Sequence, residues 1–147
     1  MTIRCEIVSQ DRTVFAGDVD IVVLPGAAGE MGILPKHAPV LTTLKYGVIK
    51  VRVGGKEELF AVAGGVAEVQ PDIVTVLADR GSENIQDIDV VRAEAAKKRA
   101  EEYLSNHSPA DTDRYLIMEA ALQRANLRLD IVQRYRKGGM RIPPSDK

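Results

Sequence analysis

The sequence predicts a β + α protein, in which an N-terminal flattened β-sandwich or barrel of short strands precedes a C-terminal antiparallel hairpin of two helices. Composition changes near Gly81, from residues rich in Val, Ile and Gly to residues rich in Ala, Arg, Glu and Lys. Short apolar runs joined by glycine-rich turns, as found before Gly81, are typical of sandwiches and barrels. We expect a β-domain over residues 1–84, a helical hairpin over 85–137 and a loose tail over 138–147.

The first half carries the signals of many short strands. Ile3, Cys5 and Ile7 recur with period two, which is typical of a half-buried strand. Gly54-Gly55 suits the positive φ angles of a tight hairpin turn. The expected strands are residues 3–8, 13–16, 19–24, 40–44, 48–53, 58–63, 66–69 and 73–77, with a turn at Gly17-Asp18, a break at Tyr46-Gly47 and a bulge or corner at Gly64-Gly65.

One stretch, from Leu24 to Pro39, stands out by its content of glycine and proline. It reads LPGAAGEMGILPKHAP and contains three glycines and three prolines. Glycine opens backbone angles that other residues avoid, whereas proline fixes φ. We therefore expect a rigid, shaped loop between strands, placed where a partner can touch it.

The second half predicts two helices. The first runs from about Asp89 to Leu104, with Asp89 available to cap it. The second begins with Ser108 as N-cap, Pro109 as first helical residue and Asp111 three residues after the cap, and ends at Gly138-Gly139. Ala93, Ala96, Ala100 and Leu104 would face Met118, Leu122, Ala125, Leu129 and Val132. Because alanine buries little area, this seam is thin and the hairpin can be opened.

Bulk composition narrows the function classes. The net charge of −1 argues against a nucleic-acid binder held by charge. A single cysteine, Cys5, rules out an internal disulfide. No run approaches the ~18 apolar residues of a membrane helix, and the N-terminus lacks the apolar core of a secretory signal. We expect membrane association only through a partner.

The residues that usually carry chemistry are sparse. His37 and His107 lie in different halves, and no spacing of His, Cys or acidic residues indicates a metal site. The chain has neither a G-x-S-x-G turn nor a G-x-x-x-x-G-K-[ST] phosphate loop. The sequence therefore predicts a non-catalytic protein with no required cofactor.

Two strings nevertheless resemble a known family. They read GEMGILPKHAP from Gly29 and AGGVAEVQPDIVTVLAD from Ala63, and they resemble the epsilon subunit of the bacterial rotary F-type ATP synthase, called delta in mitochondria. The resemblance implies a non-catalytic central-stalk subunit of the proton-driven synthase, peripheral at the cytoplasmic face of the cell membrane. It implies a β-domain bound to the gamma subunit and the c-subunit ring. Its hairpin would extend into the catalytic alpha/beta head and block ATP hydrolysis.

The resemblance also assigns residues. Glu30 and His37 match family positions that contact the c ring. The alternatives are a solvated acid for Glu30 and a loop-shaping hydrogen bond for His37.

The segment Ile88–Ala93 resembles a motif by which some bacterial members bind ATP as a regulatory ligand. The implied site comprises Glu83, Ile88, Asp89, Arg92, Ala93, Arg99, Arg124 and Arg128. Ile117 stands where the family has a further arginine, with Arg114 one turn away. The alternative is that Asp89 only caps the helix while Arg92 and Arg99 pair with neighbouring carboxylates.

Two other classes remain open at this point. One is a free-standing nucleotide-sensing module, and the other is an interaction protein built on a helical hairpin. The short polar tip from Ser105 to Ser108 suits the second class poorly, because such holders use longer apolar tips.

Overall fold

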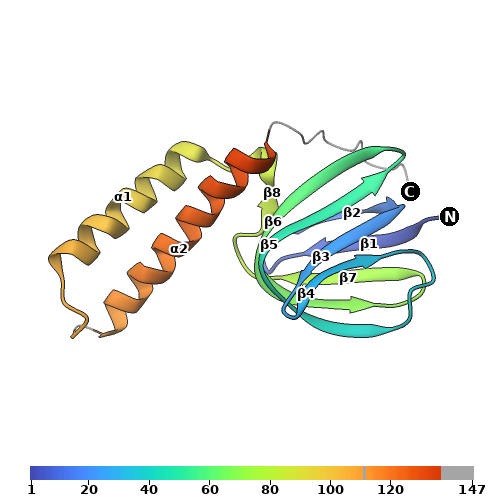
Figure 1. The fold of residues 1–147 in the computed structure, drawn as a ribbon, viewed down its shortest axis with the longest axis horizontal. Helices are drawn as coiled ribbons and strands as arrows, with labels where there is room; N and C mark the ends of the chain where they lie inside the picture. The colour runs from blue at the N-terminus through green and yellow to red at the C-terminus, as the bar shows by residue number, and fades with distance from the viewer. Residues whose placement is uncertain (111, 137–147) are drawn as a thin grey trace. The chain divides into compact units, whose positions relative to one another are not determined.

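The computed structural model describes residues 1–110 and 112–136 and confirms the predicted fold class (Figure 1). Contacts divide the chain into two units, Met1–Ile85 and a second unit that begins at Gln86 and contains both helices. The predictions for Asp111, Gly138-Gly139 and the tail lie outside the described residues.

The first unit is a sheet folded onto itself into two layers. Its ladder has the order β2-β1-β7-β6-β5-β3-β4, and β8 pairs with β6. The strands are β1 (Ile3–Val8), β2 (Thr13–Val19), β3 (Ile21–Gly26), β4 (Gly29–Ile33), β5 (Val40–Val53), β6 (Lys56–Val69), β7 (Ile73–Ala78) and β8 (Glu83–Asn84).

The two long strands β5 and β6 belong to both layers. The end of β6, around Val69, pairs with β7, which continues to β1 in the same layer, and the start of β5 pairs with this end of β6. Nearer the Gly54-Gly55 turn, β5 pairs with β3 and β6 pairs with β8. The change of layer falls at Gly64 and Gly65, whose φ angles are 103° and 137°. A Cβ on Gly65 would lie 2.2 Å from the Leu77 carbonyl oxygen, so only glycine fits this corner.

The core lies between the layers and is almost wholly aliphatic. Cys5 and Ile7 of β1 are fully buried, as the period-two pattern predicts. The Phe15 and Phe60 rings meet with centroids 5.4 Å apart and join β2 to β6.

Two predicted interruptions of the strands are wrong. Gly17 and Asp18 lie inside β2, paired with Cys5 and Arg4, and the chain turns at Asp20 instead. β5 also runs unbroken through Tyr46-Gly47. Gly47 is required there for close packing rather than for a turn, because a Cβ would lie 2.8 Å from Cβ of Pro25.

The predicted loop from Leu24 to Pro39 is also largely wrong. Most of it forms the hairpin β3–β4, closed by a two-residue turn at Ala27-Ala28 between the paired residues Gly26 and Gly29. Only residues 34–39 connect elements as a loop. The glycines allow the tight turn and the close contact between strands. The glycine and proline pattern that suggested a loop therefore belongs to a hairpin.

The end of the first unit contains a short strand that the sequence analysis did not predict. β8 pairs Asn84 with Phe60 and Glu83 with Ala61. Ser82 fixes its start, because the Ser82 hydroxyl donates to the Asp79 carbonyl at 2.8 Å and accepts from the Ala63 amide at 3.2 Å. The 3₁₀ helix η1 (Ile85–Asp87) follows.

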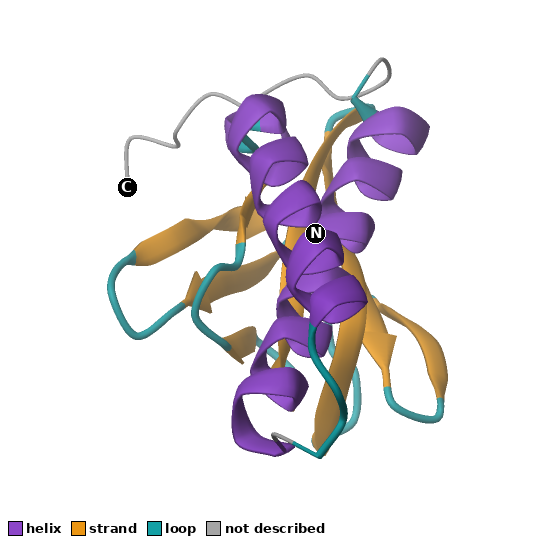
Figure 2. Ribbon diagram, turned by 90° about the vertical axis from the view of Figure 1, so that its left-hand side faces the viewer, coloured by secondary structure: helices purple, strands orange, loops and turns teal. Residues whose placement is uncertain are grey.

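The second unit is the predicted antiparallel hairpin of α1 (Val90–Asn106) and α2 (Thr112–Tyr135), seen side by side in Figure 2. Ala93 and Ala100 of α1 and Ala125 and Ile131 of α2 are its buried helical residues. The prediction that Ser108 caps α2 is wrong. Its hydroxyl accepts a hydrogen bond from the Ala110 amide at 3.3 Å and stabilises a turn ahead of the helix.

Candidate functional site

The outer face of β5, β6 and β7 carries exposed apolar side chains. Leu41, Val66 and Leu77 are 70%, 36% and 59% exposed, and we call them the apolar stripe. Val66 pairs directly with Leu77, and Leu41 pairs with Glu68, two residues along β6 on the same face. Clustered apolar side chains on the solvent face of a sheet indicate a protein contact. The sequence analysis did not single them out, although Val66 and Leu77 directly neighbour Ala67 and Val76, which are buried on the opposite face, so the alternation was visible.

A groove of about 290 Å³ opens beside Leu41 at the end of the β5–β6 pair. Apolar Pro39, Val40 and Val69 form much of its wall. Gln70 and Glu68 also line it, and the Gln70 amide donates to the Glu68 carboxylate at 2.5 Å. The groove therefore extends the apolar stripe toward the turn that joins β6 to β7.

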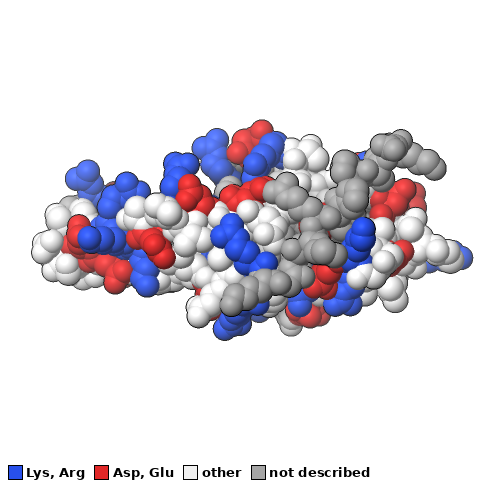
Figure 3. Space-filling view, turned by 90° about the horizontal axis from the view of Figure 1, so that it is seen from above, with Lys and Arg blue, Asp and Glu red and all other residues white. Residues whose placement is uncertain are grey.

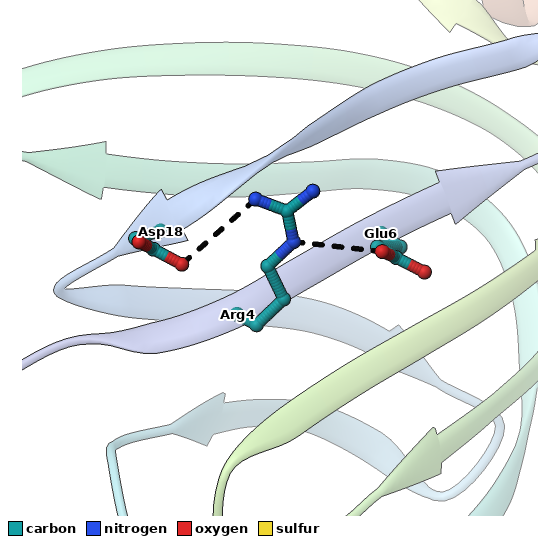
Figure 4. Close-up of polar contacts among 3 residues, drawn as sticks. All are labelled: Arg4, Glu6 and Asp18. Carbon is teal, nitrogen blue, oxygen red and sulfur yellow. Dashed lines mark hydrogen bonds and ion pairs between the residues drawn. The ribbon is translucent and has the colours of Figure 1, made fainter. Parts of the chain in front are cut away.

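The same sheet face becomes charged over β1 and β2. Arg4 lies between Glu6 and Asp18, with Nε 3.5 Å from the Glu6 carboxylate and Nη1 3.9 Å from that of Asp18 (Figure 4). All three side chains are partly exposed, so each pair adds little stability. They give the apolar stripe a polar border, which is the usual anatomy of a protein interface.

The structure places Glu30 within β4, as its second residue, and His37 beyond the other end of that strand. Glu30 is exposed next to the Ala27-Ala28 turn, and its backbone pairs with Pro25. His37 follows the last residue of β4, Ile33, by four positions. A strand rises ~3.3 Å per residue, so the two side chains do not form one contact point.

The loop that contains His37 is held by hydrogen bonds within itself and to the turn between β6 and β7. The Lys36 amide donates to the Pro71 carbonyl at 2.8 Å, and Lys36 adopts a φ of 67°. The His37 ring lies with Nδ1 2.7 Å from the Ala38 carbonyl oxygen. Because a carbonyl only accepts, Nδ1 carries the proton in this contact. This hydrogen bond within the loop agrees with the alternative that His37 shapes the loop.

In the second unit, Asp89 is the N-cap of α1. Its Oδ1 accepts a hydrogen bond from the Arg92 amide at 3.1 Å, and its carbonyl accepts from the Ala93 amide at 3.0 Å. Ile88 and Ala93 are buried, whereas Asp89 itself is exposed. The carboxylate thus complements the positive end of the helix dipole.

Arg92 and Arg99 are exposed and lie seven residues apart on α1, which places them about 10 Å apart along one side. Among residues 1–110 and 112–136, no carboxylate oxygen lies within 4.0 Å of either guanidinium. Of the alternative reading, the capping role of Asp89 is present, whereas no pair of these arginines with Asp89, Glu94 or Glu102 is formed among the residues that the structure describes. Both charges face solvent.

The other predicted nucleotide residues lie on α2 and β8. Because the helices are antiparallel and Arg136 contacts Gln86 and Ile88, Arg124 lies at about the level of Arg99. Arg128 lies within about one turn of the level of Arg92. Ile117 is 62% exposed near the start of α2. Seven of the eight predicted residues belong to the second unit, which contains the hairpin, and Glu83 belongs to the first.

The remaining surface features are modest. Basic and acidic side chains are interspersed over the face seen in Figure 3. Within the described part of the chain, no group of three or more His, Cys, Asp or Glu could hold a metal ion. No described helix is both long and apolar enough to cross a membrane.

Comparison with known proteins gives the same two-part division. Residues 2–83 match the model of the ATP synthase delta/epsilon chain beta-sandwich domain, and residues 86–133 match that of the long alpha-helix domain. The ATP synthase epsilon chain of Acidithiobacillus ferridurans is 45% identical over 139 residues, covering 95% of this chain and 96% of that one. The epsilon chain of Stenotrophomonas maltophilia is 44% identical over 142 residues, covering 92% and 96%.

A solved structure shares the fold. It is the cryo-EM structure of the Euglena gracilis mitochondrial ATP synthase, in which a chain matches with a TM-score of 0.63 and 21% identity, covering 92% of this chain and 80% of that one. The family predicted from the two sequence strings is confirmed, and with it the prediction of a non-catalytic subunit. The chain belongs to the delta/epsilon chain family of the ATP synthase.

Proposed function

We propose that this chain is a rotor subunit of a proton-driven ATP synthase, with its β-unit bound to the gamma subunit and the c-subunit ring. The observation that carries the proposal is the apolar stripe of Leu41, Val66 and Leu77 with its polar border. An exposed apolar sheet face with a polar border fits a partner protein whose contact surface is apolar at its centre. The chain then lies at the cytoplasmic face of the cell membrane, held there by the c ring.

The contact with the c ring is assigned to the β3–β4 turn. Glu30 is an exposed carboxylate beside this turn, where it can meet polar loops of a neighbouring ring. His37 lies beyond the other end of β4 and holds its own loop through Ala38. We therefore assign the direct c-ring contact to Glu30 and a loop-shaping role to His37.

The hairpin acts as the regulatory element in this proposal. Its seam contains small side chains, Ala93, Ala100 and Ala125, so little apolar area holds the helices together. Two states of similar free energy follow, one folded and one extended into the alpha/beta head, where it blocks ATP hydrolysis. A ligand shifts these states by its differential affinity for them.

ATP is the proposed regulatory ligand of the folded hairpin. Arg92 presents an exposed guanidinium group in the first turn of α1, and Arg99 presents another about two turns further along. Arg124 of α2 lies at about the level of Arg99. Forked, permanently charged donors suit phosphate oxygens. Asp89 orders the first turn of α1, which contains Arg92.

The interface is tested by titrating a purified gamma subunit with the native chain and with Leu77→Asp. A charge in the middle of the apolar stripe should weaken binding at least about tenfold. Lys56→Asp, at an exposed position beside the Gly54-Gly55 turn and at the far end of the β5–β6 pair, is the control and should bind as the native chain does. Equal affinity for all three chains would exclude the apolar stripe as the interface.

Regulation is tested on the assembled head by comparing the full chain with a chain that ends after Ile85, the last residue of the first unit. We expect inhibition of ATP hydrolysis only with the hairpin present. ATP binding is tested by calorimetry on the isolated chain and on Arg92→Ala. Absence of binding by the native chain at millimolar ATP would end the proposal of a nucleotide ligand.

A further inference from the structure

The base of the helical hairpin is closed by one arginine that the sequence analysis did not single out. Nη2 of Arg136 donates hydrogen bonds to two backbone carbonyls, that of Gln86 at 3.1 Å and that of Ile88 at 2.8 Å. The Gln86 side-chain amide donates back to the Arg136 carbonyl at 3.3 Å. These polar contacts join Arg136 to Ile88 and Gln86, which lie 48 and 50 positions earlier in the chain.

These contacts connect the two chain segments that must separate when the hairpin opens. Gln86 lies in η1 and Ile88 immediately after it, just before α1 begins at Val90. Arg136 directly follows Tyr135, the last residue of α2, and its amide still bonds to the Val132 carbonyl at 3.1 Å. A side chain anchored on the end of α2 thus holds the entrance of α1.

This contact adds charged, polar hydrogen bonds to an otherwise apolar seam. A charged guanidinium forms stronger hydrogen bonds than a neutral donor, particularly where the contact is partly buried. The apolar part of the seam is supplied mainly by alanines, which bury little area each.

We infer that Arg136 is a latch that sets how often the base of the hairpin opens. With the latch closed, the entrance of α1 and the end of α2 move as one body. Removing the guanidinium leaves the alanine seam as the main restraint, so the base opens more often. The effect of the latch on hydrolysis rests on the proposed inhibitory role of the hairpin, whereas the latch itself does not.

The test is hydrogen exchange of the full chain, followed by mass spectrometry on peptides that cover residues 86–93. In Arg136→Ala we expect these amides to exchange about ten times faster than in the native chain. Arg134→Ala is the matched control. It removes the same charge two residues away, from an exposed pair with Asp130 at 3.3 Å, and should exchange at the native rate. Equal exchange in the two variants would overturn the latch.

A conservative variant and a functional assay complete the test. Arg136→Lys keeps a charged donor and should recover part of the native protection, whereas a rate equal to that of Arg136→Ala would show that general charge is not the cause. On the assembled head, Arg136→Ala should inhibit ATP hydrolysis more strongly than the native chain. Faster exchange with unchanged inhibition would leave the latch in place and refute the inhibitory role of the hairpin.

Discussion

Asn84 of β8 donates a hydrogen bond from Nδ2 to Oε1 of Glu58 at 2.6 Å, inside the β-unit. Both residues are buried, at 6% and 8% exposure. The bond fastens the last strand of the unit to β6, two residues from the backbone pair of Asn84 and Phe60. The segment that leads to the hairpin therefore leaves from a fixed point.

Asn84→Ala should lower the free energy of unfolding by about 1–3 kcal/mol, because a buried carboxylate loses one of its partners. Urea unfolding followed by circular dichroism measures the change. Gln70→Ala removes a similar amide–carboxylate bond, to Glu68 at 2.5 Å, at an exposed site, and should cost less than about 0.5 kcal/mol. A comparable loss in both variants would contradict a special role for burial.

Gly65→Ala should destabilise the β-unit by at least about 3 kcal/mol, because the new Cβ would lie 2.2 Å from the Leu77 carbonyl oxygen in a backbone with φ of 137°. Thermal unfolding is the measurement. Gly54→Ala, where φ is 54° and nothing lies within 4 Å, isolates the cost of positive φ alone and should lose about 1 kcal/mol. Similar melting temperatures for the two variants would mean that the corner relaxes.

Burial raises the pKa of the Cys5 thiol from 9.0 to about 12. In the unfolded chain the thiol releases its proton near pH 9, whereas in the folded chain it keeps it. The contribution to stability is therefore complete below pH 9 and lost between pH 9 and about 12, at about 1.4 kcal/mol per pH unit.

Urea unfolding at several alkaline pH values should show this slope in the native chain and a shallower one in Cys5→Val, since the other titrating groups are common to both. A thiol reagent at pH 8 should label Cys5 only in denaturant. Rapid labelling of the folded chain would contradict the buried, protonated thiol.

Asp89→Ala should lower the helix content and cost the hairpin about 1 kcal/mol, because the Arg92 amide loses its acceptor. Asp89→Asn keeps the cap and removes the charge. Circular dichroism should show the same helix content in the native chain and in Asp89→Asn, and a lower helix content in Asp89→Ala. If ATP binding requires only an ordered first turn, Asp89→Asn should bind ATP at least as tightly as the native chain, because a negative charge near phosphate is removed. Loss of ATP binding in Asp89→Asn alone would show that the carboxylate contacts the nucleotide.

Sequence patterns predicted helices and strands well where one local signal, such as alternation or a capping residue, determined the element. Alternation fixed β1, and the aspartate before a helical pattern placed the start of α1 at Asp89 within one residue. They failed where tertiary packing reassigns a residue. Gly47 accommodates Pro25 rather than a turn, and Gly26 and Gly29 close a hairpin rather than a loop. β8 was missed because two residues carry no periodic signal.

The candidate sites divide in the same way. The family motif indicated Asp89, Arg92 and Arg99, because their spacing on one helix is local. The apolar stripe and the Arg136 latch each join segments that are distant in sequence. Alternation within one strand indicates which side chains of the stripe face outward, but only the fold shows that they lie side by side. Ser108 shows the converse, since this good capping residue before proline accepts a hydrogen bond from the Ala110 amide in a turn and is not the N-cap of α2.

The passage of β5 and β6 through both layers has a mechanical meaning. A twisting force applied to the outer surface of one layer reaches the other layer along covalent backbone and does not depend on side-chain packing between the layers. Such a unit resists shear better than two separate sheets joined only by a hydrophobic core. Such stiffness suits a subunit that has to hold its shape under load.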